Sequence, residues 1–139
     1  MNTQEAVRDY LSERGCAMAV IEGGVPGLLE QWEALIAAVE EGYGLGLDDY
    51  LNELDVRQLL ADVIANVPKA ETQAFTDQLQ RADEQFQALT HPTEACLWGE
   101  EVAAEEGWSS QNNFWYYRRP RNGDPDFLAE INEALADYE

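Results

Sequence analysis

Hydrophobic residues recur along most of the chain at the spacing of three and four positions that is typical of amphipathic helices. This spacing predicts a first helix that begins near Thr3 and is ended by the glycine pair at 23–24. Residues 16–21 are also compatible with a short buried strand, because so short an apolar run has no decisive period. The clearest helix follows, with Pro26 in its first turn and Gly42 at its end.

The middle of the chain predicts further helices separated by breaks. A short helix begins at Asp48, and beyond residue 54 the apolar positions change phase. Asp55 followed by Gln58 has the form of a capping box, so we expect a new helix to begin at Asp55 and to end at Pro68. The next helix covers roughly residues 70–90, with apolar positions spaced by four, three, four and three.

The last third of the chain predicts two more helices and the one segment with β-propensity. Thr93 is expected to cap a helix that reaches Glu106, and Pro125 suits the first turn of a final helix. Aromatic residues give β-propensity to the segment near 114–118. We therefore predict a single all-α domain, residues 1–139, of six or seven helices, which can include one short β-strand pair near 114–118.

The net charge of −20 limits the partners of this domain. The 139 residues include 28 Asp and Glu but only 8 Lys and Arg, while the hydrophobic fraction of 45% is ordinary for a globular protein. A surface this acidic repels nucleic acids and anionic membranes and attracts basic proteins, with association that weakens as salt rises. We expect a basic protein partner, which could itself bind nucleic acid, and no direct binding to nucleic acid or membrane.

Two dense acidic segments form the predicted partner-binding surface. One lies on the helix that ends at residue 106, and the other surrounds a glycine-rich connection that also supplies two tyrosines as aromatic anchors. The predicted contacts are Glu100, Glu101, Glu105, Glu106, Asp48, Asp49, Glu53, Tyr43 and Tyr50. Our main hypothesis is a non-enzymatic interaction protein of antitoxin, immunity or nucleic-acid-mimic type that inhibits or escorts its partner. The alternative for the same acids is the solvated or salt-adapted surface of a structural or scaffold subunit.

Basic and aromatic residues gather in one segment, 108–121, against the prevailing charge. Arginine binds carboxylate or phosphate through its planar fork, and aromatic faces stack on bases or sugars. The segment therefore supports a second hypothesis, a small-molecule binder or an enzyme. Its residues are Trp108, Trp115, Tyr117, Arg118, Arg119 and Arg121. The simpler interpretation is that alternate aromatic residues fill the core and the arginines neutralise the protein's own acids.

No catalytic or metal-binding motif is recognised in the sequence. His91 is the single histidine, precedes a proline and is expected to be an exposed loop residue. Cys16 and Cys96 lack metal-ligand spacing and are expected to be free thiols of a reducing compartment. The N-terminus has no secretory signal and no apolar run is long enough to cross a membrane, so we expect a cytoplasmic protein with no cofactor or metal. The sequence leaves open the oligomeric state and whether the two cysteines are close in space.

Overall fold

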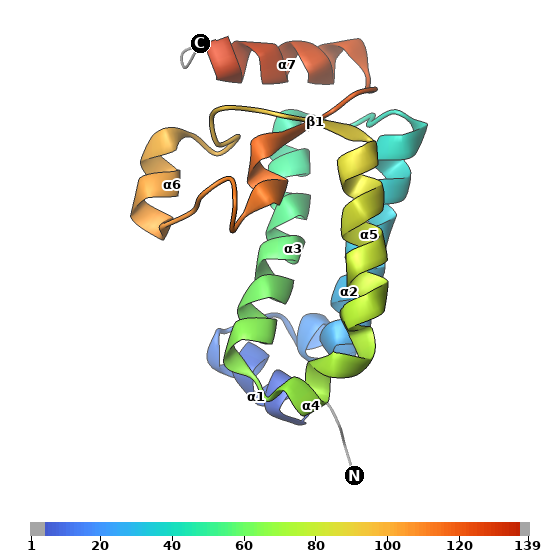
Figure 1. Ribbon diagram of the computed structural model, residues 1–139, viewed down its shortest axis with the longest axis vertical. Helices are drawn as coiled ribbons and strands as arrows, with labels where there is room; N and C mark the ends of the chain where they lie inside the picture. Colours follow the sequence, from blue (N-terminus) through green and yellow to red (C-terminus); the bar gives the residue numbers. More distant parts are fainter. Residues whose placement is uncertain (1–4, 137–139) are drawn as a thin grey trace.

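The computed structural model describes residues 5–136, which form an all-α fold with one short antiparallel strand pair (Figure 1). The predicted fold class is therefore confirmed. In chain order the elements are α1 (Glu5–Glu13), α2 (Met18–Glu41), α3 (Leu47–Asn66), α4 (Lys69–Thr72), the 3-10 helix η1 (Gln73–Phe75), α5 (Thr76–Ala88), β1 (Thr90–Pro92), α6 (Glu100–Glu106), the 3-10 helix η2 (Phe114–Tyr117), β2 (Arg118–Pro120) and α7 (Pro125–Ala136). The long helices α2, α3 and α5 stand side by side, with α1 and α4 at one end and the strand pair and α7 at the other (Figure 1).

Glycines divide the N-terminal part of the chain into helical segments. Gly15, with φ at 78°, lies in the turn between α1 and α2. Within α2, Gly24 has φ 56° and ψ −152°, so two helical segments meet there at a kink. The prediction of one helix that runs up to the glycine pair is wrong, because α1 ends at Glu13 and α2 begins at Met18. Its predicted start near Thr3 lies outside the described residues. The expected interruption at the glycine pair is confirmed by the kink at Gly24, and the alternative of a strand at 16–21 is wrong because residues 18–21 are helical.

The predicted break at Asp55 is wrong, because α3 is one continuous helix from Leu47 to Asn66. The two apolar phases are explained by partners on different sides of the helix. α3 packs against α2 and α1 and also against η2, so apolar residues of both phases are needed to cover it. The acidic residue pair at 48–49 does lie in the first turn of α3, as predicted. Acids in this position are favoured by the helix dipole.

The segment 93–117, which we call the α6 lobe, differs most from the prediction. Thr93 does not cap a helix, since its hydroxyl donates to the carbonyl of Ala95 and α6 begins only at Glu100. The aromatic run at 114–117 is the 3-10 helix η2 rather than a strand. The strand pair is present, but it joins β2 to β1 in the register Thr90 to Pro120. His91 is exposed as expected, although it lies in β1 and not in a loop.

Enclosure on several sides explains why η2 is helical. Trp115, Tyr116 and Tyr117 are all buried, whereas a strand with one covered face would bury only alternate residues. The backbone carbonyl of Tyr116 accepts from the N–H of Leu97 at 2.8 Å, and that of Tyr117 accepts from Thr93 at 2.7 Å. The first part of the α6 lobe, residues 93–113, therefore folds back over η2, which packs against α3.

A second group of contacts closes the other end of the molecule. The connection after α2 runs beside the connection before α7, with a parallel bridge between Tyr43 and Gly123 and a hydrogen bond of 2.7 Å from the Asp124 N–H to the Tyr43 carbonyl. Tyr43, Tyr50 and Phe127 pack ring against ring beneath α7, with centroids 4.7 to 5.4 Å apart. This aromatic cluster fixes the start of α3 and leaves the middle of α3 to face the α6 lobe.

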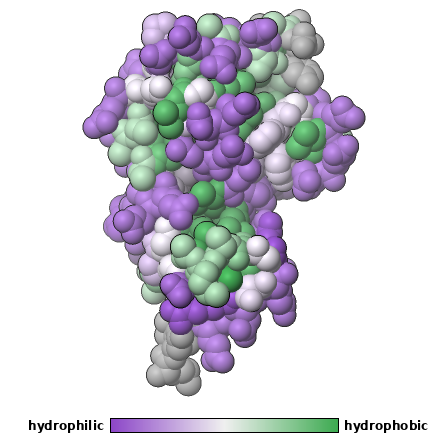
Figure 2. All heavy atoms as spheres, turned by 180° about the vertical axis from the view of Figure 1, so that it is seen from behind, coloured by the Kyte–Doolittle hydropathy of each residue, from purple (hydrophilic) through white to green (hydrophobic). Residues whose placement is uncertain are grey.

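Hydrophilic residues cover much of the face opposite to that of Figure 1, and hydrophobic residues are visible between them in both halves of the view (Figure 2). The large hydrophobic side chains that the structure leaves most exposed are Met18, Leu45 and Ile64. No helix within residues 5–136 is long and apolar enough to span a bilayer.

Candidate functional site

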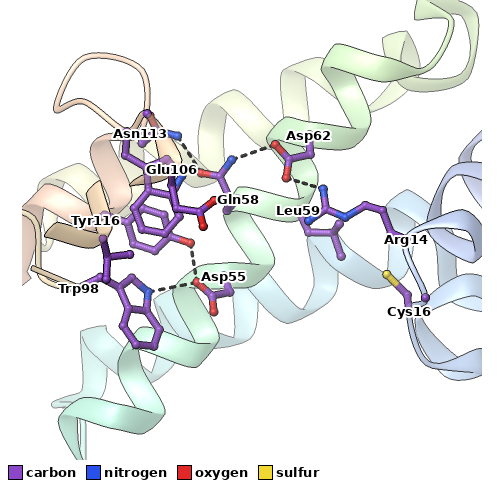
Figure 3. A pocket seen from close by; sticks show the side chains of 14 residues that line it. Arg14, Cys16, Asp55, Gln58, Leu59, Asp62, Trp98, Glu106, Asn113 and Tyr116 are labelled. Atoms are coloured by element: carbon purple, nitrogen blue, oxygen red, sulfur yellow. Dashed lines mark hydrogen bonds and ion pairs between the residues drawn. The ribbon is translucent and has the colours of Figure 1, made fainter. Parts of the chain in front are cut away.

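A cleft of about 760 Å³ opens between α3, the α6 lobe and the connection between α1 and α2 (Figure 3). Its floor is the face of α3 that carries Asp55, Gln58 and Asp62, residues spaced by three and four so that their side chains point to the same side. One wall comes from the α6 lobe, and the opposite wall includes Arg14 and Cys16 (Figure 3). Elements far apart in the chain therefore meet in this cleft.

Asp55 connects the floor of the cleft to its aromatic wall. One of its carboxylate oxygens, Oδ1, accepts hydrogen bonds from the Tyr116 hydroxyl at 2.5 Å and from the Trp98 indole N–H at 3.2 Å. Burial and the hydrogen bond to Asp55 raise the pKa of Tyr116 well above its usual value, so the phenol stays protonated and donates. The other oxygen of Asp55 has no hydrogen bond within residues 5–136, and the residue is exposed.

A chain of polar side chains crosses the floor from the α6 lobe to the α1–α2 connection. The Asn113 amide donates to Gln58 at 2.8 Å, and Gln58 donates to Asp62 at 2.9 Å. Asp62 also accepts from Arg14 at 2.6 Å. Hydrogen bonds with Tyr10 and then with Asp62 raise the pKa of Arg14, which keeps the guanidinium charged. The charge of Asp62 is thus balanced inside the protein.

The wall formed by the α6 lobe combines aromatic rings with a carboxylate. Trp108 stacks on Tyr116 with ring centroids 4.1 Å apart and an angle of 22° between the rings. Trp98 and Trp108 are both half-buried and line the cleft. Glu106, at the end of α6, is exposed and its carboxylate points into the cleft (Figure 3). Of the predicted partner-binding acids, Glu106 alone is among the lining residues.

The structure gives the other predicted acids different positions. Glu101 and Glu105 are exposed on α6, whereas Glu100 accepts a hydrogen bond of 3.2 Å from the N–H of Cys96. The second acidic segment lies at the start of α3, outside the cleft. There Asp49 accepts from the Gly46 N–H at 3.3 Å.

The start of α3 also contains Asp48, which is exposed, and Glu53, which accepts from the hydroxyl of Tyr43 at 2.5 Å. The prediction that Tyr43 and Tyr50 are aromatic anchors for a partner is wrong, because they are only 1% and 0% exposed. The hydroxyl of Tyr50 donates to the Arg118 carbonyl at 3.3 Å, and burial raises the pKa of both phenols. These tyrosines belong to the core.

The aromatic and arginine segment is divided between the core and the surface. Trp115 and Tyr117 are buried, and Trp108 is the member of the set that lines the cleft. The guanidinium of Arg118 donates to the Thr90 hydroxyl at 2.7 Å and to nearby carbonyls at 3.0 Å, so it fastens β2 to β1. Burial, followed by repulsion from Arg121, lowers the pKa of Arg118.

The expected neutralisation of the protein's own acids by the arginines of this segment is not found within residues 5–136. The ion pairs found within residues 5–136 join Arg14 to Asp62 and Arg57 to Asp83, and they involve none of Arg118, Arg119 and Arg121.

Sequence reasoning missed most residues of the cleft. Asp55 and Gln58 were interpreted as a capping box, although the same spacing, continued to Asp62, also describes a polar face of an uninterrupted helix. Trp98 carried no signal of its own, because it lies in a segment that was expected to be helical. The cysteines are free thiols as predicted, with Cys96 buried and Cys16 half-buried.

No protein-family model matches this chain, and neither does any curated protein or solved structure. The cleft and the surface around it are therefore the features that bear on function. No cluster of three or more metal-ligating side chains occurs in the part of the chain that the structure describes.

Proposed function

We propose that this protein binds a basic protein partner, and inhibits or escorts it, through the cleft and the adjoining acidic face of α6. The observation that carries the proposal is the cleft wall, where Glu106 and the free oxygen of Asp55 lie beside two indole rings. Neither carboxylate forms an ion pair with any residue in the range 5–136. A basic side chain of a partner supplies the positive charge that balances these two carboxylates.

The distribution of charge supports a protein partner over a small cation. Glu101 and Glu105 extend the negative surface beyond the cleft along α6, at the spacing of one helical turn. Charges are screened over about 8 Å at physiological salt, so those near the contact matter more than the total of the molecule. Such a surface accelerates association with a basic protein and makes it sensitive to salt.

Preorganisation is a second support. Asp55 is held by Tyr116 and Trp98, and the polar chain on the floor fixes Gln58 and Asp62 in place. Groups that are already oriented lose less conformational freedom when a partner binds, which leaves more of the interaction energy as affinity.

The test compares two charge-reversed variants in affinity capture from source-cell lysate at low and moderate salt. One is Glu101→Lys with Glu105→Lys. The matched control is Glu30→Lys with Glu133→Lys, exposed residues of α2 and α7 that change the net charge equally. We expect the native protein and the control to retain one basic protein stoichiometrically, and the α6 variant to lose it.

The captured protein is then titrated with each form at several salt concentrations, and circular dichroism confirms that the variants are folded. We expect the α6 variant to bind at least tenfold more weakly and with a smaller salt dependence. Equal affinities for both variants would show that α6 is not the binding surface. Retention of only those basic proteins that any acidic protein captures would overturn the proposal of a specific partner.

A further inference from the structure

The protein's own arginines show how it holds a guanidinium group, with a carboxylate at the edge and an aromatic ring at the face. Arg57 makes two hydrogen bonds of 2.9 Å to Asp83, and its guanidinium carbon lies 4.3 Å from the ring centre of Trp115. Arg14 is bonded to Asp62 at 2.6 Å and lies 5.8 Å from the ring of Tyr10. The same combination therefore occurs twice with an arginine in place.

The cleft contains the combination of carboxylates and aromatic faces a third time, but here no arginine within residues 5–136 lies between them. Asp55 and Glu106 supply the carboxylates, and Trp98 and Trp108 supply the aromatic faces. Within residues 5–136, one carboxylate oxygen of Asp55 has no hydrogen bond, and the side chain of Glu106 forms neither a hydrogen bond nor an ion pair. The neighbouring Arg14 is engaged by Asp62 and Tyr10, so it does not supply the missing charge.

We infer that the cleft receives an arginine side chain of the basic partner; this inference rests on the proposed function and names the group that the site recognises. The guanidinium is planar, so its N–H groups can reach Asp55 and Glu106 while its face lies against an indole. A lysine ammonium is more strongly hydrated and has no flat face to stack. The cleft volume of about 760 Å³ also accommodates the aliphatic stem and neighbouring residues of the partner.

The test uses three peptides that differ at one position. Each has the same flanking lysines, and the central residue is arginine, lysine or citrulline, which keeps the shape of arginine but has no charge. Binding to the full-length protein is measured at low salt by the shifts of the indole N–H signals of Trp98 and Trp108 in NMR spectra. We expect the arginine peptide to bind about tenfold more tightly than the lysine peptide, and the citrulline peptide to bind more weakly than either.

Two neutralising variants localise the effect. Glu106→Gln removes a carboxylate of the cleft, whereas Glu94→Gln removes an exposed carboxylate of the same lobe that does not line the cleft. The Glu106→Gln variant is expected to lose the preference for arginine over lysine. The Glu94→Gln variant is expected to keep this preference, even if its affinity for all three peptides falls slightly.

The outcomes separate this inference from the proposal on which it rests. Equal affinities for the arginine and lysine peptides, or an arginine preference that survives Glu106→Gln, would overturn the arginine site and leave a basic partner in place. Failure of all three peptides to bind at low salt would count against both.

Discussion

Arg57 is a charged residue in the interior of the protein, and Asp83 balances its charge. Their side chains are only 9% and 17% exposed. Asp83 also accepts a hydrogen bond of 3.1 Å from the Trp32 indole. One guanidinium nitrogen of Arg57 has no hydrogen-bond partner in the described structure. A buried ion pair contributes little net stability, but removal of one member leaves an unpaired charge in a region of low dielectric. The stability of the core therefore depends on Asp83.

We expect Asp83→Ala to lower the free energy of unfolding by about 3–5 kcal/mol. The double variant Arg57→Met with Asp83→Leu should be less destabilised, since it leaves no buried charge unpaired. Urea denaturation followed by circular dichroism gives both values. A loss below about 1 kcal/mol for Asp83→Ala would mean that water reaches Arg57 and replaces the carboxylate.

At the residue scale, the sequence indicates which side chains could bind a partner better than it indicates which of them are exposed. Glu106 is predicted as a binding residue and lies in the cleft, but Tyr43 and Tyr50, predicted as aromatic anchors for a partner, are buried. Their rings pack against Phe127, which belongs to the last helix. Since this contact joins segments far apart in the chain, no local pattern of acids and glycines could reveal it.

At the scale of elements, the kink in α2 is the most constrained backbone feature. The φ and ψ values of Gly24 belong to a region that only glycine occupies without strain. Gly24 is also buried beside Val25, so the chain cannot easily shift to relieve the strain. The neighbouring Gly23 is exposed within the helix, and a Cβ at that position would meet no atom within 4 Å.

The two adjacent glycines should respond in opposite ways to alanine. Gly24→Ala is expected to destabilise the protein by about 1–3 kcal/mol, because alanine is strained in that conformation. Gly23→Ala is expected to stabilise it by up to about 1 kcal/mol, because alanine favours the helix. Thermal unfolding of the two variants beside the native protein measures the difference, and equal shifts would contradict the kink at Gly24.

Glycine and proline residues in the sequence located helix ends correctly, but the change in spacing of the apolar residues did not mark one. The predicted end of α2 at Gly42 and the predicted end of α3 before Pro68 agree with the structure. The change of phase after residue 54 was interpreted as a break, although α3 is covered on one side by α2 and on another by η2. The period of an amphipathic pattern describes a helix with one covered face, and α3 has more than one.

At the scale of the whole molecule, the charge of −20 is opposed by few internal contacts. Within residues 5–136, two ion pairs are found, and one of them is buried. Repulsion among the remaining acids raises the free energy of the folded chain more than that of the expanded unfolded chain. Moderate salt screens this repulsion, whatever the function of the acidic surface.

We expect the melting temperature to rise by about 5 °C as KCl increases, with the gain complete at about 0.2 M. Differential scanning calorimetry across a KCl series is the measurement, with a neutral osmolyte at matched water activity as the control. A need for molar salt would instead support the alternative of a salt-adapted structural subunit.

The bridge between Tyr43 and Gly123 has a consequence for the order in which the chain assembles. It closes a long loop that contains α3, α5 and the whole α6 lobe, and the entropic cost of this closure is offset only by the contacts that form when α7 packs. Neighbouring helices α1, α2 and α3 make contacts between segments close in the chain, which form early. The α6 lobe folds later, because it packs against segments that are distant in the chain. The cleft thus exists only in the completed fold. Whatever occupies it binds the native state alone, and its affinity adds directly to the resistance of the protein to unfolding.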